Sequence, residues 1–89
     1  MWTIHKQKLQ IMDEQLIEVG ATSEILSVAM QKDELCIWYT FNTLDPKKAK
    51  IKIYIHGTGH KITDDQTKFI GTVLLEYLVF HVFNGGPVQ

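Results

Sequence analysis

The segment His56-Gly57-Thr58-Gly59-His60 holds the residues of this sequence that are best suited to chemistry. Two imidazoles four residues apart would form a metal-binding pair on a helix, but the glycines and the strand pattern before them exclude a helix, and no third ligand lies nearby in the sequence. Gly57 and Gly59 can take positive φ, and successive backbone N–H groups in such a turn form a concavity that suits an anion. The segment therefore predicts an anion-binding turn, with a plain tight turn as the alternative.

The residues that lead into this turn alternate in character. Lys50, Lys52, Tyr54 and His56 fall on one side of a predicted strand, and Ile51, Ile53 and Ile55 fall on the other. The lysines could meet phosphate and Tyr54 could stack on a base. The alternative is a solvated sheet face on which lysine protects an edge.

A sheet is needed to position these side chains, and the recurring period of two predicts strands joined by short turns. We expect strands at 2–9, 15–19, 25–30, 35–41 and 50–56, and two more within 68–83 that turn near Glu76 and Tyr77. Residues 31–34 predict a polar hairpin turn. The expected fold is all-β, a small antiparallel β-sandwich or open barrel of about six to seven strands.

The chain is short enough to form one domain with one core. We expect residues 1–84 to form a single β domain and residues 85–89, which begin Gly85-Gly86-Pro87, to form a flexible C-terminal tail. Residues 57–67 predict a loop, in which Asp64 or Asp65 could bond its own backbone or cap a helical turn. A domain this small buries a modest fraction of its surface, so we also expect an oligomer.

Charge and composition limit the classes of partner. Nine basic and ten acidic residues leave a net charge of -1, which disfavours a nucleic acid polymer or a membrane surface as the partner. All nine cations are lysines, so a phosphate would be met by ammonium groups and backbone N–H groups, without a planar arginine fork. Nothing in the sequence predicts a membrane segment, and we expect a cytoplasmic protein.

Four further residues are informative. Cys36 is the only cysteine, which fits a reducing compartment, and its apolar neighbours predict a buried residue without nucleophilic chemistry. Trp38 and Tyr39 lie on opposite faces of their strand, so one of them points inward and the other is left for an interface or a stacked base. His81 lies in an apolar strand, where its ring needs a hydrogen-bond partner.

Seven short motifs in order along nearly the whole chain carry a resemblance to a known family. They are Ile4-His5-Lys6, Asp13-Glu14-Gln15 with Ile17-Glu18, Leu26-Ser27-Val28, Leu35-Cys36-Ile37-Trp38, Gly57-Thr58-Gly59-His60, Ile70-Gly71-Thr72 and Leu78-Val79-Phe80-His81-Val82-Phe83. This run resembles a widespread family of small phage-encoded proteins that carry a domain of unknown function. The family includes sponge proteins that bind the cyclic nucleotide signals of bacterial anti-phage defence of the CBASS type.

The resemblance implies a phage immune-evasion protein in the host cell cytoplasm. Such a protein sequesters cyclic oligonucleotides, for example cyclic GMP-AMP, without cleaving them, and it works as a homo-oligomer, a tetramer in this reading. It would be no enzyme and would need no metal or cofactor. A ligand with two phosphates and two bases would suit lysines, glycine-turn N–H groups and aromatic faces.

The residues expected at the ligand come from two sources. The resemblance implies the turn, where Thr58 and His60 would donate hydrogen bonds, together with three positions in other motifs; the alternating strand face adds two more. The full set is Gly57, Thr58, Gly59, His60, Trp38, Lys6, His81, Lys52 and Tyr54. Trp38 or Tyr54 would stack on a base, and the lysines would neutralise charge.

Two other classes of function remain open from the sequence. One is a structural or protein-binding phage module that docks a partner through its sheet and binds no nucleotide. The other is a small metal-dependent hydrolase that uses His56, His60 or His81, which we disfavour because no complete ligand set or acid and base pair is visible in the sequence.

Overall fold

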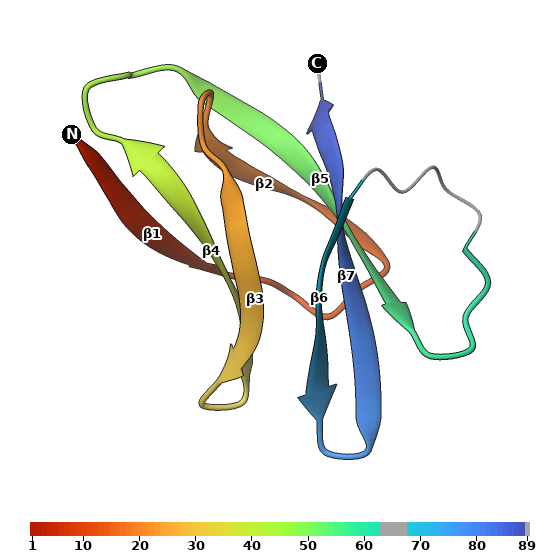
Figure 1. Ribbon diagram of the computed structural model, residues 1–89. Helices are drawn as coiled ribbons and strands as arrows, with labels where there is room; N and C mark the ends of the chain where they lie inside the picture. Colours follow the sequence, from red (N-terminus) through yellow and green to blue (C-terminus); the bar gives the residue numbers. More distant parts are fainter. Residues whose placement is uncertain (63–67, 89) are drawn as a thin grey trace.

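The computed structural model describes residues 1–62 and 68–88, which form seven strands in two antiparallel sheets (Figure 1). A three-stranded sheet has the order β1-β4-β3, and a four-stranded sheet has the order β2-β5-β7-β6. The strands are β1 (Trp2–Lys8), β2 (Glu14–Gly20), β3 (Ile25–Gln31), β4 (Glu34–Asn42), β5 (Lys48–Gly57), β6 (Lys68–Leu75) and β7 (Leu78–Val88). The predicted all-β fold of antiparallel strands is confirmed. Asp64 and Asp65 lie outside the described residues.

Alternation along the strands places the core between the sheets. On β5, Ile51, Ile53 and Ile55 are all buried, as their spacing predicts. They join one apolar cluster whose buried members are Leu9, Ile17, Val19, Leu35, Ile37, Tyr39, Ile51, Ile53, Ile55, Val73 and Val82. The opposite face of β5 therefore points away from the core, and it leads toward the glycine turn.

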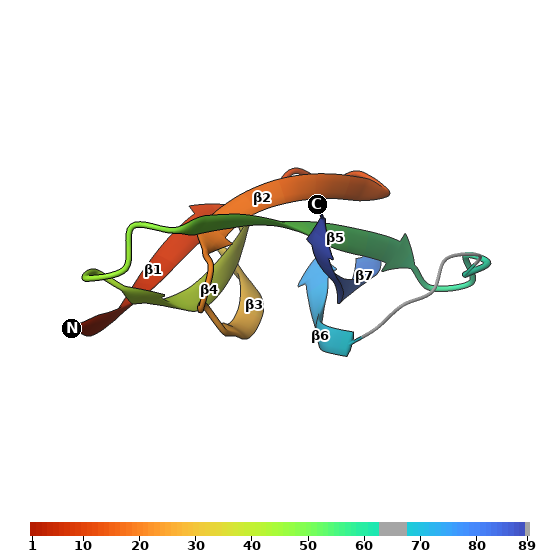
Figure 2. The same ribbon diagram turned by 90° about the horizontal axis from the view of Figure 1, so that it is seen from above.

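The two sheets meet through β3, which packs against β6, and through β2, which packs against β4. In Figure 2, β2 and β5 run along one side of the molecule, with β1, β3 and β4 toward one end and β6 and β7 toward the other. In this view β3 faces β6. The molecule is flattened, with principal extents of 41 × 30 × 16 Å. Both sheets thus keep one broad outer face directed away from the shared core.

Residues at the hairpin turns take backbone angles in the left-handed region of φ/ψ space. Lys32 and Asp33, between β3 and β4, have φ of 49° and 65°, which suits a two-residue hairpin turn. Glu76, between β6 and β7, has φ of 56°. The hairpin predicted at 31–34 and the strand pair predicted to turn near Glu76 and Tyr77 are both confirmed.

The predicted flexible tail at 85–89 is wrong for its described part, because β7 continues to Val88 and pairs with β5. The Gly-Gly-Pro sequence allows this through a bulge: the register shifts between Ile51 and Ile53, and Gly86 takes φ of 86° while its N–H donates to Asn84 Oδ1 at 2.8 Å. Gly85 is also required, because a Cβ there would come within 2.5 Å of the Tyr54 ring.

Candidate functional site

The candidate site is a small hollow where β5 ends and the glycine turn lies against β7 and β6. Its volume is about 220 Å³. Five of the nine residues expected at a ligand are brought together in it, namely the four residues of the turn and His81. The lining residues are His56, Gly57, Thr58, Gly59, His60, Ile62, Phe69, His81 and Phe83.

Hydrogen bonds hold the glycine turn closed. The backbone N–H of His60 donates to Gly57 O at 3.1 Å, and the N–H of Gly57 donates to His60 Nδ1, also at 3.1 Å. Because Nδ1 of His60 is an acceptor here, the neutral ring carries its proton on Nε2, which leaves an N–H donor at the site. The N–H of Thr58 donates to Val79 O at 3.3 Å and so ties the turn to β7.

The two glycines of the turn have different roles. Gly59 has φ of 90°, a conformation that favours glycine, and a Cβ there would meet nothing within 4 Å. Gly57 does not take positive φ, in contrast to the expectation from sequence. A Cβ there would lie 3.1 Å from the His60 ring, so the ring would have to shift by a few tenths of an ångström. Gly57 therefore allows the His60 ring to fold back onto the end of the strand.

His81, on β7, finds the hydrogen-bond partners that its apolar strand demands. Nε2 of His81 lies 2.9 Å from the hydroxyl of Thr58, and Nδ1 lies 3.0 Å from the hydroxyl of Thr72 on β6. The imidazole thus bridges the glycine turn and the neighbouring strand. Because each hydroxyl can donate or accept, the arrangement satisfies either tautomer of the ring.

His56 lies at the same site but was not among the residues expected at the ligand. Its Nε2 is buried and has no hydrogen-bond partner. The ring is stacked parallel to Tyr54, with centroids 6.4 Å apart, and meets Phe83 edge-on at 6.0 Å. The sequence signal for His56 was its place on the alternating strand face directly before the turn. In the structure, the strand pairing sets it opposite His81.

Aromatic rings continue from the hollow along the outer face of the four-stranded sheet. Tyr54 pairs with Phe83 in register, and Phe83 pairs with Phe69. The rings of Phe69 and Phe83 meet edge-on with centroids 5.5 Å apart. Beyond Tyr54, the ammonium of Lys52 lies 5.9 Å from its ring centroid and 3.3 Å from a carboxylate oxygen of Glu14. The face thus ends in a lysine whose charge is shared with an acidic neighbour.

Trp38 and Lys6, which were expected at the ligand, lie elsewhere. Both belong to the three-stranded sheet, where they are cross-strand partners. Their side chains point to the outer face of that sheet, because the alternate residues Ile37 and Tyr39 point to the core. The ammonium of Lys6 donates to Gln31 Oε1 at 2.8 Å. One chain therefore does not bring these two residues to the hollow.

Two observations complete the description of the site. Within residues 1–62 and 68–88, no cluster of three or more His, Cys, Asp or Glu side chains could hold a metal ion. In the same part of the chain, no helix is long and apolar enough to cross a membrane.

The fold and the hollow define a small two-sheet β-protein with a histidine-lined concavity at a strand end. A family model described as "Domain of unknown function (DUF7352)" matches residues 1–89. Because the match spans the whole sequence, the chain belongs to this family. Comparison with curated protein sequences and with solved structures finds no match.

Proposed function

We propose that this protein binds a cyclic oligonucleotide second messenger, such as cyclic GMP-AMP, and sequesters it intact. The ligand class comes from the motif resemblance to phage sponge proteins, and the hollow supports it with groups suited to a base and a phosphate. The protein would act as a homo-oligomer in the host cell cytoplasm and would deplete the signal on which CBASS-type defence depends.

The observation that carries the proposal is the unpartnered Nε2 of His56. A buried polar atom without a hydrogen bond costs about 1–3 kcal/mol, and a ligand group that bonds to it recovers that free energy. The neighbouring rings of Tyr54 and Phe83 are apolar on their faces. A planar base with polar atoms on its edge matches this combination of a stacking surface and a buried ring nitrogen.

Hydrogen-bond donors at the mouth of the hollow suit a phosphate. Nε2–H of His60 is available because Nδ1 of that ring accepts from the backbone. The hydroxyl of Thr58 lies against His81, and the backbone at Gly59 is open to close approach. The N–H groups of Gly57, Thr58 and His60 already donate within the protein, so the turn does not form the predicted concavity of successive free N–H groups. The ligand charge would instead be met by the side-chain donors and by the N–H of Gly59.

The size of the hollow indicates how a cyclic dinucleotide would lie. About 220 Å³ is below the roughly 300–1,000 Å³ of most small-molecule sites, so it would hold one base or one phosphate. The remainder of the ligand would lie along the outer face of the four-stranded sheet, over Phe83 and Tyr54, toward Lys52. A second copy of the chain would cover the exposed part of the ligand in an oligomer.

The hydrogen bonds also support binding without cleavage. Both ring nitrogens of His81 and Nδ1 of His60 already bond within the protein. These imidazoles hold the turn in place, and their engaged nitrogens are not directed at a scissile phosphate. We therefore propose that the ligand leaves the site unchanged.

The test is to incubate the purified protein with a panel of cyclic di- and trinucleotides and to measure binding by titration calorimetry. The complex is then denatured, and the released nucleotide is identified by mass spectrometry. Recovery of an unaltered nucleotide supports sequestration. A cleaved product would show an enzyme, and absence of binding across the panel would overturn the proposal.

The second candidate function is a protein-binding module, and one observation favours it. The tip of the β6–β7 hairpin is apolar and exposed: Leu74 is 68% exposed, Leu78 is 56% exposed, and Tyr77 is 99% exposed. Exposed aromatic side chains of this kind are frequent anchors in protein interfaces. This candidate predicts that a Tyr77→Ser variant loses a protein partner, while the purified protein binds no cyclic nucleotide.

A further inference from the structure

The outer face of the three-stranded sheet carries an apolar surface on the side of the molecule away from the core. Trp2 is 55% exposed, Ile4 is 61% exposed and Leu26 is 44% exposed, and the half-buried Trp38 lies on the same face. A shallow depression of about 440 Å³ is lined by Ile4, Leu26, Ser27, Ala29 and Trp38. Monomeric proteins rarely expose large contiguous apolar patches, and such patches often mark an interaction site.

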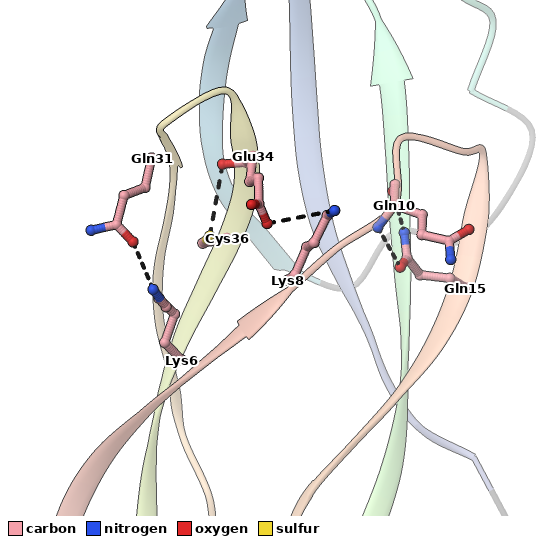
Figure 3. Close-up of polar contacts among 7 residues, drawn as sticks. All are labelled: Lys6, Lys8, Gln10, Gln15, Gln31, Glu34 and Cys36. Carbon is pink, nitrogen blue, oxygen red and sulfur yellow. Dashed lines mark hydrogen bonds and ion pairs between the residues drawn. The ribbon is translucent and has the colours of Figure 1, made fainter.

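The other end of this face is polar and carries both signs of charge (Figure 3). The ammonium of Lys6 bonds to Gln31 Oε1 at 2.8 Å, across the strand β4 that lies between them, and Lys8 lies 3.5 Å from Glu34. Cys36, the cross-strand partner of Lys8, is buried. The face is thus divided into an apolar end and a polar end of mixed charge.

We propose that this outer face is an isologous contact between two copies of the chain. The edge strand β1 presents Trp2, Ile4, Lys6 and Lys8 to the face in that order, apolar first and cationic second. A two-fold axis that crosses β1 at Ile4 sets the two copies of β1 antiparallel, with Lys6 of one copy beside the Trp2 indole of the other. The same axis places Ile4 of one copy against Ile4 of the other.

The mixed charges of the face favour a second copy over a strongly charged partner. Lysine over an aromatic ring is a contact that this fold already makes, since Lys48 Nζ lies 4.3 Å from the ring centroid of Phe41. The net charge of -1 gives little repulsion between copies. A stable interface buries about 800 Å² on each partner, and an apolar centre with a polar rim is its usual arrangement, so the polar end would form the rim of this contact.

This contact also accounts for Trp38 and Lys6, which the hollow does not include. They are cross-strand partners at the junction of the apolar and polar ends of the face. The contact uses the three-stranded sheet, and the candidate site uses the four-stranded sheet. It therefore does not depend on the identity of any ligand.

The test is sedimentation velocity of the purified full chain over a range of concentrations, with an Ile4→Glu variant and a Leu74→Glu control. Ile4 and Leu74 are similarly exposed, at 61% and 68%, on different sheets. We expect wild type and Leu74→Glu to form dimers or higher even-numbered assemblies. Ile4→Glu should raise the dissociation constant at least about tenfold, because it places an unpaired charge in the contact.

Tryptophan fluorescence gives a second readout, because the two tryptophans of the chain, Trp2 and Trp38, both lie on this face. Dilution of the wild type should shift the emission to the red as the indoles become solvated, and circular dichroism should show that Ile4→Glu remains folded. A wild type that is monomeric at all concentrations would overturn the proposal. An assembly that survives Ile4→Glu but is lost in Leu74→Glu would also overturn it.

Discussion

The hydroxyl of Thr58 lies 2.9 Å from Nε2 of His81, and this contact couples the glycine turn to β7. On the other side of the same ring, Nδ1 lies 3.0 Å from the hydroxyl of Thr72. A neutral imidazole has one donor and one acceptor, so one threonine donates to the ring while the other accepts from it. A ligand that bonds to Thr58 would therefore fix the tautomer of His81 and the orientation of the Thr72 hydroxyl.

We call the hydrogen-bonded series Thr58–His81–Thr72 the relay. It predicts that Thr58→Val and Thr72→Val are not additive in their effects on stability. Each variant should lower the free energy of unfolding by about 0.5–1.5 kcal/mol, the usual net contribution of one hydrogen bond. The double variant should depart from the sum by at least about 0.5 kcal/mol, because both hydroxyls bond one ring. Urea unfolding of the single and double variants measures this coupling.

A matched control for the relay is Thr43→Val. The hydroxyl of Thr43 also makes one hydrogen bond, to the backbone oxygen of Met1 at 3.1 Å, away from His81. Combined with Thr58→Val it should be additive within experimental error. Equal coupling in the two pairs would contradict a relay through His81.

His56 gives a prediction in which stability and binding change in opposite directions. His56→Phe keeps a ring against Tyr54 and removes the buried, unpartnered Nε2, so the unfolding free energy of the ligand-free protein should rise by about 1 kcal/mol. If the proposed nucleotide bonds to Nε2, its affinity should fall about tenfold. Thermal unfolding and titration calorimetry measure the two effects.

His5→Phe is the control for that substitution. The His5 ring is exposed and stacked on Phe41 at 4.5 Å, so it offers another histidine among aromatic rings but far from the hollow in the fold. It should leave nucleotide affinity unchanged. A His56→Phe protein that is less stable than wild type would show that Nε2 is bonded in solution.

The two glycines of the turn should respond differently to alanine. Gly59→Ala should lower the unfolding free energy by about 1–2 kcal/mol through backbone strain alone, since its φ is 90° and no atom crowds a Cβ. Gly57→Ala should instead shift the His60 ring by a few tenths of an ångström and weaken the hydrogen bond that its Nδ1 accepts. Nitrogen NMR of the imidazole would report that change as a mixture of tautomers, and an unaltered His60 spectrum would contradict it.

The sequence predicted the fold well because its strands obey simple alternation. The isoleucines of β5 are the clearest example, and the hairpin turns at 31–34 and near Glu76 were also identified correctly. The site was predicted only in part. The turn and His81 meet through the β5–β7 pairing, but the same reasoning could not show that Trp38 lies on a different sheet. Strand order is a long-range property, and no local pattern in the sequence specifies it.

The C-terminal segment shows a second reason for error. Gly85-Gly86-Pro87 has the composition of a flexible end, yet its glycines are used for a bulge and for close contact with Tyr54. Composition alone does not distinguish a glycine that provides flexibility from one that gives space to a neighbouring ring.

Truncation after Asn84 tests this corrected view of the C-terminus. Removing the end of β7 leaves Lys50 and Ile51 without their partners and uncovers Ile51, which is only 7% exposed. The unfolding free energy should fall by about 1.5–3 kcal/mol, the range for exposing one buried aliphatic side chain. The amides of β5 should also exchange faster with solvent. Unchanged stability and exchange would restore the flexible-tail interpretation.

Tyr39 predicts a loss of stability at high pH. Burial, and then the nearby Glu18 carboxylate, raise the pKa of Tyr39 above its ordinary value of 10.0. The unfolded chain therefore releases this proton first as the pH rises through 10, and the folded state is destabilised until its own higher pKa is passed. The stability that depends on the protonated phenol is fully present below pH 10 and is lost above it.

Tyr39→Phe and Tyr77→Phe separate this effect from the titration of lysines. Tyr39 is 7% exposed in the core, whereas Tyr77 is 99% exposed and serves as the surface control. Between about pH 8 and pH 11, wild type and Tyr77→Phe should lose more unfolding free energy than Tyr39→Phe does, because the phenylalanine ring has no proton to release. Urea unfolding at both pH values measures the difference. Parallel losses in all three proteins would show that Tyr39 ionises as readily in the folded state as in the unfolded chain.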